Sequence, residues 1–123
     1  MITDRVQFTD DDVSLKISFI DQTGTEVPVS DLTNILCEVK NYRIETPSLK
    51  YALYATGEYS DYIEMPQFDD NKYARLIIES DQMQTLPVGL IIIVATYLYP
   101  DENFSDDSRQ ITKKGMLWHL KER

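Results

Sequence analysis

The sequence predicts an all-β fold: a two-sheet antiparallel sandwich of about seven to nine strands in a single domain over residues 1–123. Three observations support this prediction. Short segments alternate apolar and polar residues, as half-buried strands do. Glycine and proline are sparse and fall between these segments, where turns are expected. One long uncharged run, residues 90–99, is rich in β-branched and aromatic residues.

The long run at residues 90–99 predicts the most unusual strand. A membrane helix needs roughly 20 apolar residues, and this run is about half that length. An antiparallel strand with one wet face should alternate, but here the even positions Leu90, Ile92, Val94 and Leu98 are as apolar as the odd ones. Two interpretations stay open: the domain covers both faces of this strand, or one apolar face is kept for a neighbouring subunit.

The N-terminal half contains the clearest alternation, at residues 13–20, where Val13, Leu15, Ile17 and Phe19 share one face. Gly24 ends a turn and is free to take a positive φ. The strands predicted in this half are residues 5–8, 13–20, 25–27 and 35–44.

The C-terminal half predicts strands at residues 51–55, 59–65 and 73–79, before one short helical turn at 80–86. Ser80 or Asp81 is expected to cap that turn. The long apolar strand then follows, with a very acidic loop at 100–108. Residues 110–120 close the chain as a strand, with Gly115 expected at a bulge or a close approach.

Composition restricts the classes of partner. Of the 123 residues, 42% are hydrophobic and 27% charged, which is ordinary for a globular domain. The net charge of −9 argues against nucleic acid and against anionic membrane surfaces. No apolar segment follows Met1, so no signal peptide is expected, and the chain should stay in the cytoplasm of the cell that makes it or leave on lysis.

No catalytic constellation is present, so we expect no enzyme activity. His119 is the single histidine, and no G-x-S-x-G element supplies a nucleophile. Cys37 alternates with Ile35 and Val39, which indicates a buried, inert thiol. One cysteine and one histidine cannot build a zinc site. The acidic clusters at 10–12, 69–70 and 101–107 have oxygen ligands of the kind calcium uses, but we interpret them as solvated loops and expect no cofactor or metal.

The aromatic residues allow two interpretations. Tyr51, Tyr54, Tyr59 and Tyr62 lie close together in sequence and would form a sugar-stacking surface if they were exposed, or pack in a core or protein interface if they were not. Trp118 alternates with Met116 and Leu120, which indicates core or interface packing.

The second half follows a sequence of elements that is familiar from one family. Leu86-Pro87-Val88-Gly89 enters the long strand, and the closing strand carries Gly115-Met116-Leu117. This pattern resembles the immunoglobulin-like N-terminal domain of phage baseplate upper proteins and related phage virion modules. In those domains a Leu-Pro-x-Gly element precedes the penultimate strand and a Gly-x-Leu element lies in the last one. The resemblance implies an immunoglobulin-like sandwich and a place in a phage particle.

The resulting hypothesis is a non-enzymatic bacteriophage virion protein that acts in structure or assembly at the capsid, neck, tail or baseplate. Its partners would be other virion proteins or further copies of itself. It would act by burying apolar surface, with possible pairing at an exposed sheet edge. The alternative is a carbohydrate-binding or adhesin-like module built on Tyr51, Tyr54, Tyr59 and Tyr62. The residues predicted to form the interface are Leu90, Ile92, Val94, Leu98 and Trp118.

Overall fold

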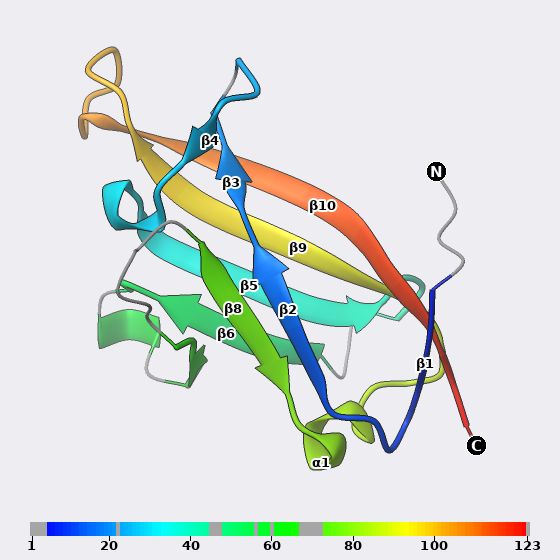
Figure 1. The fold of residues 1–123 in the computed structure, drawn as a ribbon. Coiled ribbons are helices and arrows are strands. Elements are labelled where there is room, and N and C mark those ends of the chain that lie inside the picture. The colour runs from blue at the N-terminus through cyan, green and yellow to red at the C-terminus, as the bar shows by residue number, and fades with distance from the viewer. Residues whose placement is uncertain are drawn as a thin grey trace.

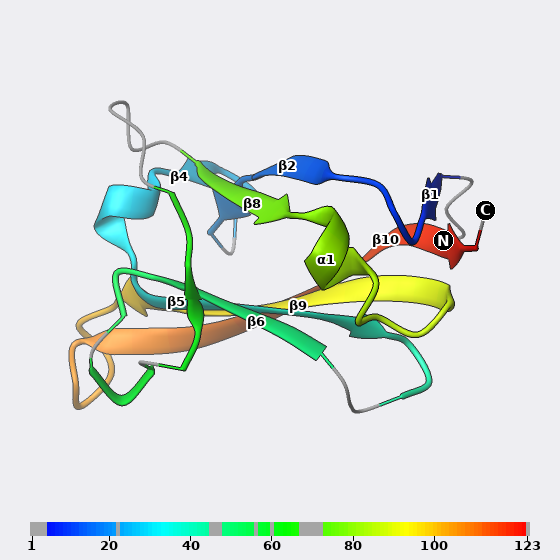
Figure 2. The same ribbon diagram turned by 90° about the horizontal axis from the view of Figure 1, so that it is seen from below.

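The computed structural model describes residues 5–21, 23–44, 48–55, 57–59, 61–66 and 73–122. These residues form mostly strands, which confirms the all-β prediction. Two layers face each other across a shared core (Figures 1 and 2).

One layer is a six-stranded sheet that curls into a half-barrel. The three central pairings, β10 with β9, β9 with β5 and β5 with β6, are antiparallel, whereas the outermost strands β1 and β7 pair in parallel with their neighbours. In spatial order the strands are β1 (Val6–Phe8), β10 (Ser108–Lys121), β9 (Gly89–Pro100), β5 (Thr33–Asn41), β6 (Ser48–Leu53) and β7 (Ile63–Glu64).

The other layer is smaller and covers only the inner face of this sheet (Figure 2). Two separate antiparallel ladders form it, together with one short helix. Its elements are β2 (Val13–Ile17), β8 (Ala74–Ile78), β3 (Phe19–Ile20), β4 (Glu26–Val27) and α1 (Ser80–Met83). The short 3₁₀ turns η1 (Val29–Asp31) and η2 (Gly57–Tyr59) occur in the connections.

The core lies between the layers and takes side chains from both. Its largest fully buried members are Trp118, Tyr51 and Tyr97. Tyr97 of β9 joins the layers, because its ring meets Phe19 edge to face at 4.9 Å and its hydroxyl donates to the carbonyl of Ile20 at 3.1 Å. This contact supplies a hydrogen-bond partner for a phenol that is otherwise buried.

The architecture differs from the predicted one in three respects. The alternating segment 13–20 is interrupted at Ser18, so that β2 pairs with β8 while β3 pairs with β4. Three sheets and ten strands therefore replace the predicted two sheets and seven to nine strands in the described residues. Both edge pairings are parallel. A parallel pairing needs more than a tight hairpin turn between its strands: β1 pairs with β10 at the other end of the chain, and β7 follows β6 only after a connection that contains η2.

Smaller predictions had mixed outcomes. Gly24 has a φ of +87°, as its turn required. The helix cap is Glu79 rather than Ser80 or Asp81, and the backbone N–H of Glu79 donates to Oε1 of Gln82 at 2.9 Å. The prediction for Gly115 was wrong: a Cβ there would lie 3.7 Å from Cγ2 of Ile93, an ordinary contact. The register shift in β10 occurs further on, between Met116 and Trp118.

Candidate functional site: the outer face of the six-stranded sheet

The even-numbered side chains of β9 point away from the core. The odd positions Ile91, Ala95 and Tyr97 are buried, whereas Leu90, Ile92, Val94 and Leu98 are only half-buried. Because successive side chains of a strand point to opposite faces, these four residues share the outer face of the sheet. No described element forms a layer over that face (Figure 2). We call it the outer face.

The strand register shows what surrounds these residues. Ile92 lies between Lys40 of β5 and Met116 of β10, and Val94 lies between Glu38 and Lys114. The outer face therefore has an apolar strip along β9 with charged side chains on both sides. Since the sheet curls around its core, this face is convex.

The charged neighbours explain why the strip is half-buried without a covering layer. Long lysine side chains lay their methylene groups along apolar surface and keep the ammonium group in water. Nζ of Lys40 also lies 3.9 Å from Oε1 of Glu38, so these two side chains hold each other beside the strip. Such a border of charge around an apolar centre is typical of protein interfaces.

The strip continues into an exposed apolar patch at the end of the sheet where β9 begins. Tyr42 is 63% exposed, Val88 50% and Ile44 40%. These residues line a depression of about 550 Å³ together with Leu90 and His119. Large apolar side chains that cluster in this way on a surface mark interaction sites.

Asn41 holds together the end of the outer face where β9 begins. It is 5% exposed, and its Nδ2 donates to the carbonyls of Pro87 at 3.2 Å and Val88 at 2.8 Å. Its Oδ1 accepts from the N–H of Arg43 at 2.9 Å. A single buried amide thus ties the start of β9 to the end of β5 and fixes both segments that carry the patch.

Gly89 permits this arrangement. Its φ is +128°, and a Cβ at this position would lie 2.8 Å from Nδ2 of Asn41. The Leu-Pro-x-Gly element therefore ends in glycine here for two reasons, namely its backbone conformation and the close approach of Asn41.

Trp118 does not belong to this face, so its assignment as an interface residue was wrong. It is fully buried, while Met116 is 40% exposed. The bulge between them places Leu117 as an extra residue, so Met116 pairs with Ile92 on the outer face and Trp118 pairs with Ile91 on the inner face. Period-two alternation across residues 116–118 cannot reveal this change.

The four tyrosines do not form a stacking platform. Tyr51 is 1% exposed and is part of the core, so it cannot meet a sugar. Burial, together with the nearby Glu79 carboxylate, raises its pKa to about 12. The rings of Tyr59 and Tyr62 meet at 75° with centroids 5.4 Å apart, an edge-to-face contact rather than two coplanar faces. Tyr54 is half-buried and packs against the core.

The sequence missed several members of the candidate site. Leu36 and Met116 join the outer face through their pairing with Thr96 and Ile92. The patch residues Tyr42 and Ile44 lie in the predicted end of one strand, and Val88 lies in the predicted entry to the next.

The structure also places the other reactive groups that the sequence singled out. Cys37 is fully buried, as predicted, and burial raises the pKa of its thiol to about 12. In the part of the chain that the structure describes, no three His, Cys, Asp or Glu side chains are placed to share a metal ion. Within the same residues, no helix has the length and apolar character needed to cross a membrane. The acidic cluster at 69–70 lies outside the described residues.

Comparison with protein-family models, with curated proteins and with solved structures finds no match to this chain.

Proposed function

We propose that this chain is a non-enzymatic structural or assembly protein of a bacteriophage particle, and that it docks onto other virion proteins or further copies of itself through the outer face. The observation that supports this most is the apolar strip of Leu90, Ile92, Val94 and Leu98, which no described element covers. The patch of Tyr42, Ile44 and Val88 extends it. The virion setting rests on the resemblance of the Leu86–Gly89 and Gly115–Leu117 elements to phage virion modules.

The immunoglobulin-like assignment is part of this proposal. Two facing layers and the long hairpin of β9 and β10 are compatible with it. The divided second layer and the parallel edge pairings depart from the usual immunoglobulin pattern. The proposed docking mechanism depends on the outer face alone and holds for either topology.

The physical mechanism is the removal of apolar surface from water. Each half-buried aliphatic side chain of the strip still has exposed area to lose, at about 25 cal/mol per Å². The bordering charges of Glu38, Lys40 and Lys114 would set the orientation of the partner more than the affinity. A convex apolar strip suits a sheet or a groove of the partner, with side chains interdigitating as in stacked sheets.

The carbohydrate-binding alternative has lost its main support, because Tyr51 is in the core and Tyr59 and Tyr62 meet edge to face. Phe19 and Tyr97, another pair of rings in contact among the described residues, also meet edge to face.

The test compares wild type with Ile92→Glu by light scattering, alone and mixed with the purified products of the genes that flank this one. A carboxylate buried without a partner at the centre of the strip should weaken association by about 3 kcal/mol, or roughly a hundredfold in Kd. Ile77→Glu is the matched control, since Ile77 is also exposed but lies on β8 in the other layer. Folded Ile92→Glu protein that associates as tightly as wild type would refute the proposal.

A further inference from the structure

β10 leaves most of one edge of the large sheet open. β1 pairs only with residues 119–121 of β10, and no other described strand pairs along that side. Figure 1 shows β10 as the outer long strand of its layer, with β1 at its far end. The open stretch, residues 108–117, has backbone groups directed away from β9 that a further strand can bind.

The charge of β10 differs from that of the rest of the chain. The net charge of the protein is −9, yet the 14 residues of β10 include no aspartate or glutamate. They carry the four cations Arg109, Lys113, Lys114 and Lys121. Three of these lie within the open stretch, which makes it a basic edge on an acidic protein.

A cavity of about 330 Å³ lies along this edge. It is lined by the five consecutive residues 109–113 together with Ile20 and Asp21. Consecutive side chains point to opposite faces, so a hollow shared by all five has to follow the edge of the strand rather than either face. We call this hollow the edge notch.

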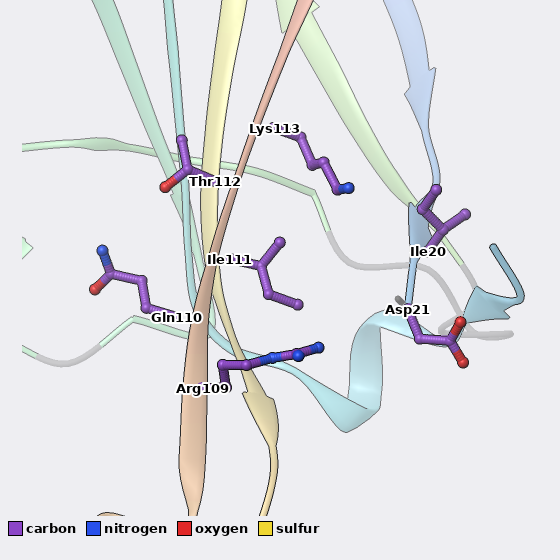
Figure 3. A pocket seen from close by; sticks show the side chains of 7 residues that line it. All are labelled: Ile20, Asp21, Arg109, Gln110, Ile111, Thr112 and Lys113. Atoms are coloured by element: carbon purple, nitrogen blue, oxygen red, sulfur yellow. The ribbon is translucent and has the colours of Figure 1, made fainter. Parts of the chain in front are cut away.

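Figure 3 shows how the edge notch is built. Arg109, Ile111 and Lys113 extend from β10 toward Ile20 and Asp21 of the other layer, while Gln110 and Thr112 extend to the opposite side. Arg109 and Lys113 thus stand on either side of an isoleucine along the notch, and the Asp21 carboxylate is directed away from β10.

The Asp21 carboxylate is engaged by its own turn. Its Oδ1 accepts from the N–H of Thr23 at 2.9 Å, the hydroxyl of Thr23 at 2.6 Å and the N–H of Thr25 at 3.0 Å. These hydrogen bonds hold the acid at the rim of the notch. An incoming acidic group would therefore meet Lys113 along β10, on the side away from Asp21.

We propose that the open edge of β10, from Arg109 to Met116, binds an extended acidic segment of a partner protein as an added strand, with one acidic side chain in the edge notch. Backbone hydrogen bonds supply the affinity in this mode of recognition, and the side-chain pocket supplies the specificity. The proposed site uses the open backbone edge of β10 and the notch rather than the apolar strip of the outer face, so the inference does not depend on the proposed function.

Two arguments select this occupant. Pairing this edge with the same edge of a second copy would place two basic stretches side by side, and like charges close together across strands are destabilising. The loop that precedes β10 carries Asp101, Glu102, Asp106 and Asp107. Those carboxylates repel an acidic segment beyond Ser108, and so they confine it to the stretch that the lysines border.

The experiment titrates the full chain by calorimetry with a synthetic peptide of alternating glutamate and threonine, about eight residues long to match the edge. A lysine–threonine peptide of equal length controls for charge. The same glutamate–threonine peptide with N-methyl groups on alternate amides keeps its charge but cannot pair as a strand. We expect only the unmodified acidic peptide to bind and to protect amides of residues 108–117 from hydrogen exchange.

Two matched variants of the protein locate the site. Lys113→Glu should weaken peptide binding by about tenfold or more, whereas Lys121→Glu should not, because β1 already covers that part of the same strand. Ile92→Glu should leave peptide binding unchanged, which separates this inference from the proposed function. Equal binding of the N-methylated peptide, or no binding of the acidic peptide, would each overturn it.

Discussion

Gly89→Ala is expected to destabilise the protein strongly, because this glycine lies where β9 begins and Asn41 packs against it. The φ of +128° is unfavourable for alanine by about 1–3 kcal/mol. The new Cβ would also lie 2.8 Å from Nδ2 of Asn41, so the amide has to move. Its displacement breaks the hydrogen bonds to Pro87 and Val88 and leaves a buried amide unsatisfied, which costs about 1–3 kcal/mol more.

The combined loss of about 2–6 kcal/mol is a large share of the roughly 5–15 kcal/mol that stabilises a typical domain. Urea denaturation followed by circular dichroism measures it directly. The two contributions separate in a double-mutant cycle with Asn41→Ala. Removing the amide makes room for the methyl group, so the double variant should be more stable than the sum of the single losses predicts, by about 1–2 kcal/mol. A loss below about 1 kcal/mol for Gly89→Ala, or strict additivity, would refute the reasoning.

Three further predictions concern individual side chains. Trp118→Ala should lower the free energy of unfolding, measured by urea denaturation, by about 3–5 kcal/mol, because the indole is fully buried. A loss near zero would contradict the burial of Trp118. Gly115→Ala should change stability by no more than about 0.5 kcal/mol, since its Cβ meets only Cγ2 of Ile93 at 3.7 Å. Tyr51 has a pKa of about 12 against an ordinary 10, so its phenol ionises more readily in the unfolded chain and its contribution to stability is lost as the pH rises from 10 toward 12. Tyr51→Phe should reduce this alkaline loss, and an unchanged pH profile would contradict the assignment.

Local patterning allowed much of the fold to be predicted. The alternation at Ile35, Cys37 and Val39 correctly placed these residues in the core, and Gly24 correctly marked a turn with positive φ. Hydrophobic burial acts residue by residue, so a strand with one wet face reveals its inner side from the sequence alone.

The features that failed depend on distant parts of the chain. The division of 13–20 into β2 and β3 reflects their separate partners, β8 and β4, which no local pattern identifies. The bulge in β10 puts Met116 and Trp118 on opposite faces of the sheet, because one extra residue of β10 is accommodated against β9. The parallel pairing of β1 with β10 joins the two ends of the described chain.

The candidate site was predictable in part for the same reason. The uniform apolarity of Leu90, Ile92, Val94 and Leu98 singled out these side chains, and the register places them together on the outer face. The patch of Tyr42, Ile44 and Val88 arises where Asn41 joins two segments 46 residues apart in sequence, so it required the structure.

The most direct test of the outer face measures thiol labelling of Val94→Cys, alone and in the phage particle to which we propose the chain belongs. Cys37 is fully buried with a pKa near 12, so the introduced thiol is the one that reacts. Ile77→Cys, on the other layer, is the control. We predict that a maleimide labels both variants in the isolated chain, and that assembly protects Val94→Cys while Ile77→Cys still reacts. Equal labelling of both positions in the particle would contradict the assignment of the outer face as the docking surface.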